Sequence, residues 1–215
     1  MQDDDLIRSV ASELYWDPKV DSTAIAVSAH DGVVTLRGTV GSFREKREAE
    51  TDAKHVHGVE LVDDQLQVKP LNQAARKDAD VRGDVLQALA LDSLVPATID
   101  AKVDHGMVTL TGTADWQYQR SEAELVASNV VGALQVNDEI TLNPKPNAGD
   151  VRESITDAFR RNARLDAERL SITTDEGTVT VKGTVNSWDE HDAAINAAWS
   201  APGVTRVEDH ITVKY

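Results

Sequence analysis

Apolar residues along the chain follow two periods, one typical of helices and the other typical of strands. Across Leu6–Leu14 they recur at every fourth position, which predicts an amphipathic helix with one buried face. From Ile25 onward they alternate with other residues, as expected of a strand that buries one face. The string DGVVTLRGTV at 31–40 then opens with an Asp-Gly pair, which is typical of a tight hairpin turn, and continues as a second strand.

A second helix and a third strand complete this unit. Ser42 and Glu45 have the spacing of a capping box, so a helix is predicted to begin there. Small apolar residues at helical spacing across 49–56 predict that its buried face packs closely on the sheet. A last alternating run at 62–68 predicts the third strand. The hydrophobic pattern therefore predicts a unit with the element order αββαβ.

The whole unit occurs three times. The string at 31–40 returns as HGMVTLTGTA at 105–114 and as EGTVTVKGTV at 176–185. In each copy a second glycine follows the first by six residues, and a third follows the second by 20. Glycines at fixed spacing usually mark backbone geometry, so we interpret them as a hairpin turn, a bend or close approach of a helix, and a helix end. These structural glycines are Gly32, Gly38, Gly58, Gly106, Gly112, Gly132, Gly177, Gly183 and Gly203.

The repetition defines the expected fold class, an α+β protein made of three tandem αββαβ modules. Each module is expected to be a small three-stranded mixed sheet with two helices on one face. The expected domains are 1–70, 75–143 and 148–215, joined by short polar segments of which the second contains two prolines.

Composition and charge narrow the possible functions. The 215-residue chain has a net charge of −15, and each third of it is acidic, which argues against binding to nucleic acid or to an anionic membrane by charge. It has no Cys, so thiol chemistry is excluded. The first residues do not resemble a signal peptide, and no stretch approaches the roughly 18 apolar residues of a membrane span. We therefore expect a cytoplasmic protein, or a periplasmic one if a leader has been removed.

The repeated pattern resembles the BON domain family, a module named after a bacterial osmotically inducible protein and nodulation proteins. The similarity covers 5–68, 78–142 and 149–213. It comprises the G-x-V-T-L-x-G-x-V string, a Ser-capped Ala-rich helix, a Gly-Val pair and a closing V-x-x-x-I-x-V strand. The resemblance implies a bacterial, transport-associated protein of the osmotic stress response that binds phospholipid. Some BON proteins are also implicated in potassium sensing. The family's usual Asn in the closing strand is present only as Asn137 of the middle copy.

No catalytic arrangement is recognisable in the sequence. The G-x-S-x-G nucleophile motif, the phosphate-binding loop and the dinucleotide-binding glycine pattern do not occur. We therefore predict no enzymatic activity, no catalytic residues and no cofactor. His55 and His57 would point in different directions at the end of a helix, so no metal site is predicted from histidines.

Acidic pairs recur in the third strand of every copy. We interpret them as a solvated outer sheet face whose charge discourages aggregation through the edge strand. The alternative is a weak potassium or calcium site that would make the chain a cation-responsive sensor, although calcium prefers six or more oxygen ligands. The pairs are Asp63 with Asp64, Asp138 with Glu139, and Glu208 with Asp209.

Aromatic residues are the remaining candidates for binding. Tyr15 and Trp16 end the first helix, while Phe43, Trp116 and Trp188 stand at the start of the second helix in successive copies. They either staple and pack the local core or form an exposed rim that contacts a partner or lipid. We predict a non-enzymatic, stress-associated scaffold that binds a protein partner or a phospholipid or other envelope component. Weak peripheral membrane binding through exposed aromatics is a further alternative.

Overall fold

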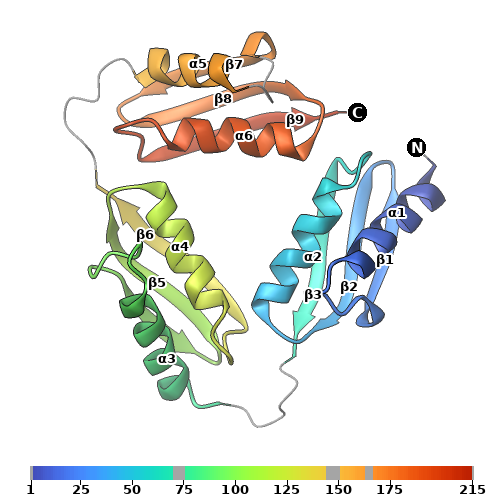
Figure 1. Ribbon diagram of the computed structural model, residues 1–215, viewed down its shortest axis with the longest axis vertical. Helices are drawn as coiled ribbons and strands as arrows, with labels where there is room; N and C mark the ends of the chain where they lie inside the picture. The colour runs from blue at the N-terminus through green and yellow to red at the C-terminus, as the bar shows by residue number, and fades with distance from the viewer. Residues whose placement is uncertain (1, 70–75, 144–150, 163–166, 215) are drawn as a thin grey trace. The chain divides into compact units, whose positions relative to one another are not determined.

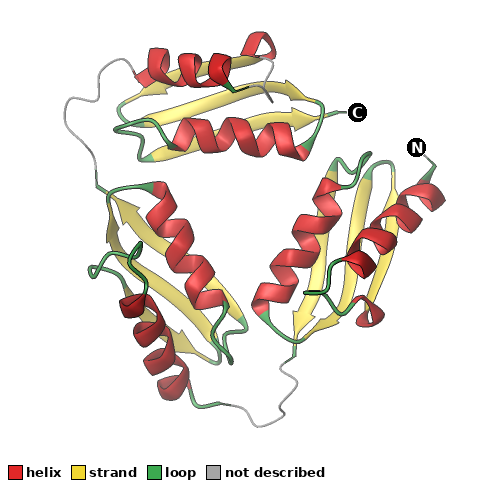
Figure 2. Ribbon diagram, in the orientation of Figure 1, coloured by secondary structure: helices red, strands yellow, loops and turns green. Residues whose placement is uncertain are grey.

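Three separate three-stranded sheets follow one another along the chain in the computed structural model, which describes residues 2–69, 76–143, 151–162 and 167–214 (Figure 1). The chain divides into two compact units, of which the first holds the first two sheets and the second holds the third sheet. In every sheet two helices lie on one face (Figure 2). We refer to each sheet with its helices as the first, second or third module. This architecture confirms the predicted α+β fold with repeated αββαβ units.

The first module sets the pattern of strand pairing. Strands β1 and β2 are antiparallel, and β2 pairs with β3 in parallel, so the sheet is mixed as predicted. The register sets Val34 beside Val62 and Leu36 beside Asp64. Its elements are α1 (Asp3–Trp16), the 3₁₀ turn η1 (Ser22–Ala24), β1 (Ile25–His30), β2 (Val33–Val40), α2 (Phe43–His55) and β3 (Leu61–Val68).

The second and third modules repeat this order. The third sheet has the same antiparallel and parallel pairing as the first. The second module comprises α3 (Asp78–Leu91), β4 (Asp100–Asp104), β5 (Met107–Ala114), α4 (Gln117–Ser128) and β6 (Gln135–Leu142). The third comprises α5 (Val151–Arg161), η2 (Ala167–Arg169), β7 (Leu170–Asp175), β8 (Thr178–Val185), α6 (Trp188–Trp199) and β9 (Arg206–Val213).

The predicted helical stripes form the cores. Leu6, Val10 and Leu14 on α1 are buried, and so are Ala49 and Ala53 on α2. Because alanine side chains are short, the second helix can lie close to the strands it covers. The corresponding stripes of the other modules are buried in the same way: Val81, Val85 and Leu89; Ala123 and Ala127; Ile155 and Phe159; Ala194 and Ala198.

The first glycine of each repeat forms the predicted hairpin turn. Asp31 and Gly32 both have positive φ angles, 48° and 78°, as a tight two-residue turn requires. The third glycine differs from expectation, because α2 ends at His55 and Gly58 lies three residues later with φ of 95°. Val59 donates its amide to the carbonyl of Val56, so this glycine shapes the turn after the helix and does not end the helix itself.

The second glycine allows a close backbone approach, and the approaching group is not a helix of the core. A Cβ on Gly38 would collide with the carbonyl oxygen of Ala24, the last residue of η1, and its φ is 139°. Gly112 and Gly183 face the carbonyls of Thr98 and Arg169 in the same way. Because this glycine has no side chain, the segment that precedes the first strand can pass close to the end of the second strand.

The predicted capping residues hold the start of the second helix. Ser42 Oγ accepts the amide of Glu45 at 3.1 Å, and Ser187 Oγ accepts the amide of Glu190 at the same distance. In the first module the returning carboxylate of Glu45 accepts the amide of Gly41 at 2.7 Å. It also accepts the amide of Asp21 at 2.8 Å, so this cap fastens the helix start to the loop before β1.

Candidate functional site

Tyr15 and Trp16 form the most exposed aromatic pair among the described residues, with 76% and 81% of their surface accessible. They stand at the end of α1, beyond its buried stripe. The other predicted contact aromatics, Phe43, Trp116 and Trp188, are only partly accessible. Trp188 packs against the third core, which agrees with the stapling interpretation for that residue. The structure thus separates the five candidates into an exposed pair and three partly accessible residues.

The second module exposes an apolar residue at the equivalent place. Leu91 is the last residue of α3, as Trp16 is the last residue of α1, and it is 78% accessible. Sequence reasoning missed Leu91 because the search was confined to aromatics. The available signal was its position two residues after the buried Leu89, which places it off the buried helical stripe.

Charged side chains gather beside the aromatic pair. Lys19 Nζ lies 2.7 Å from Glu48 Oε2 and 3.1 Å from Asp17 Oδ2, which ties the loop after α1 to α2. Burial, together with the charge of Asp17, raises the pKa of Asp52 to about 6. Asp52 Oδ2 is buried and has no hydrogen-bond partner among the described residues. Arg44 Nε lies 3.5 Å from Glu48 Oε1, so Lys19 and Arg44 together offset only part of the negative charge of Asp17, Glu48 and Asp52.

The acidic pairs of the third strands are split between two faces of the sheet. Successive strand residues point to opposite faces, so Asp63 points outward while Asp64 shares the inner face with Val62 and Leu66. The interpretation of both residues as outer-face charges is therefore wrong for Asp64. By the same alternation it is wrong for Asp138 and Asp209.

Each inner aspartate is already held by its own module. Asp64 Oδ1 accepts the amide of Leu66 at 2.8 Å, and Oδ2 lies 3.5 Å from Lys46 Nζ on α2. In the second module Asp138 accepts the amide of Ile140 at 2.9 Å, and its Oδ2 lies 2.7 Å from Nη2 of Arg120 on α4. We call this arrangement the helix–strand ion pair.

The third module places a histidine at the same position. His191 Nε2 lies 2.7 Å from Asp209 Oδ2, and Asp209 Oδ1 accepts the amide of Ile211 at 2.9 Å. The inner aspartates are thus paired with side-chain bases. The sequence signal for these bases was available, since Lys46, Arg120 and His191 all stand eight residues after the second glycine of their repeat.

The outer carboxylates take part in polar contacts along the strands. Asp63 accepts a hydrogen bond from Gln65, and Glu208 accepts one from Thr180. The described residues contain one group with metal-binding geometry, formed by Asp78, Asp104 and His105, and none of these belongs to the predicted acidic pairs. Asp78 in that group accepts the amides of His105 and Gly106 at 2.9 and 3.0 Å, so it anchors the hairpin turn.

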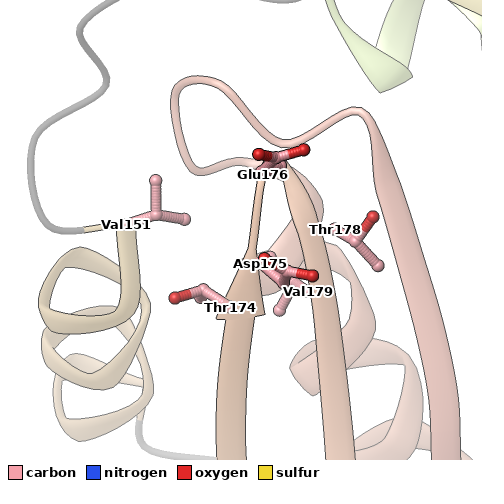
Figure 3. Close-up of a pocket in the computed structure, with 7 residues that line it drawn as sticks. Val151, Thr174, Asp175, Glu176, Thr178 and Val179 are labelled. Atoms are coloured by element: carbon pink, nitrogen blue, oxygen red, sulfur yellow. The ribbon is translucent and has the colours of Figure 1, made fainter.

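A hollow of about 210 Å³ lies between the start of α5 and the hairpin of the third module. Val151 of α5 borders it on one side, and residues 174–179 of the β7–β8 hairpin border it on the other (Figure 3). Its described lining offers acidic, hydroxyl and apolar side chains but no histidine, lysine or arginine.

The described part of the chain contains no helix with the length and apolar character needed to span a bilayer.

Comparison with solved structures gives only weak likeness. The chain aligns with CdsD, a structural protein of the type III secretion system of Chlamydia trachomatis, at 14% identity and a TM-score of 0.27. The alignment covers 98% of this chain and 92% of that one. The C-terminal domain of CdsD aligns at 13% identity with the same TM-score, covering the whole of both chains. These scores are too low to support an argument about fold or function.

Comparison with known sequences is more informative. Osmotically-inducible protein Y of Escherichia coli strain K12 is 32% identical over 145 residues, which is 65% of this chain and 72% of the relative. An uncharacterized protein encoded in the gshII 5′ region of Anaplasma centrale is 29% identical over 126 residues, covering 55% of this chain and 83% of the relative.

The family comparison covers almost the entire sequence. The BON domain model matches residues 2–70, 77–144 and 147–215, one match for each αββαβ module. The glycines, the caps and the Ala-rich helices that carried the resemblance all have structural roles in these modules. The chain belongs to the BON domain family, of which it contains three consecutive copies.

Proposed function

We propose that this chain is a non-enzymatic, stress-associated binding scaffold whose BON modules present partner-binding surfaces. The observation that carries the proposal is the exposure of Tyr15 and Trp16, which the core of the first module does not use. The similarity to osmotically-inducible protein Y supports a role under osmotic stress. The absence of a recognisable catalytic motif in the sequence supports a binding function.

The repeats divide residues into those that keep the fold and those that differ on the surface. Glycines, caps and small core residues recur because each module needs the same backbone. The end of the first helix varies instead, since it exposes Tyr15 and Trp16 in the first module and Leu91 in the second. Exposed aromatic and aliphatic side chains of this kind commonly anchor protein interfaces. The modules are therefore suited to different partners or to different parts of one partner.

Charge favours a protein partner over an anionic membrane at this surface. Glu13 and Asp17 flank the aromatic pair, and Glu48 and Asp52 lie nearby, so these four acids outnumber Lys19 and Arg44, the bases that contact Glu48. The end of a helix also carries partial negative charge from its free carbonyl groups. Such a surface repels anionic headgroups, whereas a lysine or arginine on a protein partner would be attracted and could stack on Trp16. The proposed partner is a protein with a basic contact surface.

Site-directed photocrosslinking tests this proposal in extracts of osmotically stressed cells. A photoreactive amino acid at position 16 of the full chain should capture a distinct protein, and a twofold to fourfold excess of unlabelled chain should reduce that capture. The same probe at Ala26, which is exposed on β1, is the matched control and should not give that product. Excess chain carrying Trp16→Ala should compete poorly.

Vesicle cosedimentation separates the lipid alternative. The full chain and Trp16→Ala are mixed with phosphatidylglycerol or phosphatidylcholine vesicles at low and physiological salt. Binding that depends on Trp16 would replace the protein-partner proposal with peripheral membrane association. If neither crosslinking nor cosedimentation depends on position 16, the exposed pair is not the binding surface and the proposal is wrong.

A further inference from the structure

The helix–strand ion pair differs among the modules in the chemistry of its base. Lys46 in the first module and Arg120 in the second remain charged throughout the physiological pH range. His191 in the third is the one position of this set whose side chain titrates near neutral pH. The same contact between second helix and third strand is therefore built from two permanent charges and one conditional charge.

The partners of His191 match its charged form, in which both ring nitrogens can donate a hydrogen bond. Nε2 lies 2.7 Å from Asp209 Oδ2 on β9, and Nδ1 lies 2.9 Å from Asp192 Oδ1 on α6. Both partners accept hydrogen bonds when ionised, so both ring nitrogens must donate, and only imidazolium carries two N–H groups. The side chain of His191 is 11% accessible, which limits the ability of water to replace either partner.

From this geometry we propose that His191 is a pH-dependent clamp that holds α6 to β9 in the third module, while the first two modules keep permanently charged pairs. Neutral imidazole has one N–H, so deprotonation leaves either Asp192 or Asp209 facing a lone pair at hydrogen-bonding distance. The contact then changes from two hydrogen bonds between opposite charges to one hydrogen bond donated by a neutral ring and one repulsion. This device goes beyond partner binding, since it makes one of the three modules responsive to pH.

Other charged groups on the elements around His191 have contacts of their own. On the same helix, Glu190 accepts the amide of Asn186 at 2.7 Å. On β9, Glu208 pairs in register with Thr180 and accepts its hydroxyl, while Asp209 pairs with Val181. Lys182 on β8 is exposed, and Arg160 on α5 lies 3.4 Å from Asp157 of its own helix. Asp192 and Asp209 are the charged groups that contact the two ring nitrogens.

Two opposing effects on the imidazole ring determine whether the stability of the third module rises or falls with pH. Burial disfavours the charged imidazole, but the hydrogen bonds to Asp192 and Asp209 outweigh it and raise the pKa of His191 above its ordinary value. A raised pKa in the folded state gives stability that is complete below the unfolded pKa and is lost as pH rises through the folded one. The third module should therefore be tightest in mild acid and should weaken as the pH rises above neutral.

The test uses the full chain and takes its replacement residues from the sister modules. Trp16→Phe and Trp116→Phe leave Trp188 and Trp199, so tryptophan fluorescence then reports only the third module. The urea midpoint of this chain is measured from pH 5.5 to 9. With His191 it should fall as pH rises, whereas His191→Lys and His191→Arg should flatten that dependence. A pH dependence that is unchanged in folded His191→Lys or His191→Arg would overturn the proposal.

Nitrogen-15 NMR of the histidine rings can be measured on the unmodified chain, so this test does not require that a His191 variant folds. The ring of His191 should titrate above the ordinary imidazole pKa of about 6.5, and Asp209→Asn should lower its titration midpoint. The ring centroids of His191 and Trp188 are 4.8 Å apart, so Trp188 fluorescence should change over the same pH range. Titration of His191 at or below that ordinary value would show that the ring is not clamped and would overturn the proposal.

Discussion

At the scale of single residues, the carboxylates of this acidic chain differ in whether a donor reaches them. Asp78 accepts two turn amides, and these hydrogen bonds hold the pKa of its carboxyl below the usual value. Burial raises the pKa of Asp64, although the Leu66 amide and Lys46 oppose the shift. Asp52 is the extreme case, since its Oδ2 has no donor among the described residues and its pKa is raised to about 6. Local donors, more than net charge, decide what each acid contributes.

Asp52→Asn should stabilise the first module at neutral pH. The folded pKa of about 6 exceeds the ordinary aspartate pKa of 3.8, so Asp52 favours the folded state only when protonated, and this contribution is lost as pH rises from about 4 to about 6. At pH 7 the replacement should raise the free energy of unfolding by about 1 kcal/mol, after allowance for solvent screening. Thermal unfolding of the full chain between pH 4 and pH 7 measures both effects.

The exposed Asp63 provides the matched control for this replacement. Asp63→Asn removes the same charge on the outer face of the sheet, where the side chain is exposed, so it should change the free energy of unfolding at pH 7 less than Asp52→Asn does. If both variants change stability equally, reduced net charge explains the effect and the local account of Asp52 is incorrect.

At the scale of elements, the same glycine position controls how each first strand enters its sheet. In the second module a Cβ on Gly112 would collide with the carbonyl oxygen of Thr98, and the φ of 124° is also unfavourable for any other residue. Gly83 on α3 is the opposite case, because a Cβ there would meet nothing within 4 Å. The fold therefore requires glycine at position 112, whereas the helix only tolerates it at position 83.

Replacing each of these glycines with alanine should change stability in opposite directions. Gly112→Ala should lower the free energy of unfolding of the second module by at least about 2 kcal/mol, through the clash and backbone strain. Gly83→Ala should raise it by about 0.5–1 kcal/mol, because alanine favours the helix. Urea unfolding followed at Trp116 measures both. Equal effects of the two replacements would contradict the assigned role of Gly112.

The elements could be predicted from the sequence because their signals are local. Helical stripes such as Leu6–Leu14, the turn glycines and the Ser caps each act within a few residues, and the repeats gave each signal three times. The helix–strand ion pair was not predicted, because its two members are distant in the sequence. Lys46 on α2 pairs with Asp64, which is 18 positions later on β3. Each aspartate of these ion pairs stands beside a second acidic residue in the sequence, and the two were interpreted together. Adjacent strand residues face opposite sides of the sheet, so only one of the two can contact the helix.

At the scale of the whole molecule, the first and third modules form separate hydrophobic cores. The core of the first module includes Leu6, Val10, Leu14 and Leu36, whereas the core of the third includes Phe159 and Val181. No residue is common to these two clusters of the described chain. Stability should then be distributed among the modules, and each could respond to its own conditions, as the His191 clamp requires of the third.

Phe159→Ala should therefore unfold one module and spare the others. Phe159 is 1% accessible, and removing a buried phenylalanine side chain costs about 3–5 kcal/mol, a large share of the stability of a small module. Hydrogen exchange of the full chain should show protection lost in β8 and α6 but retained in β2 and β5. Leu36→Ala is the reciprocal control and should reduce protection in β2 while sparing β8. Loss of protection in all three sheets after either change would show that the modules fold as one cooperative unit, which would leave no basis for a pH response confined to the third.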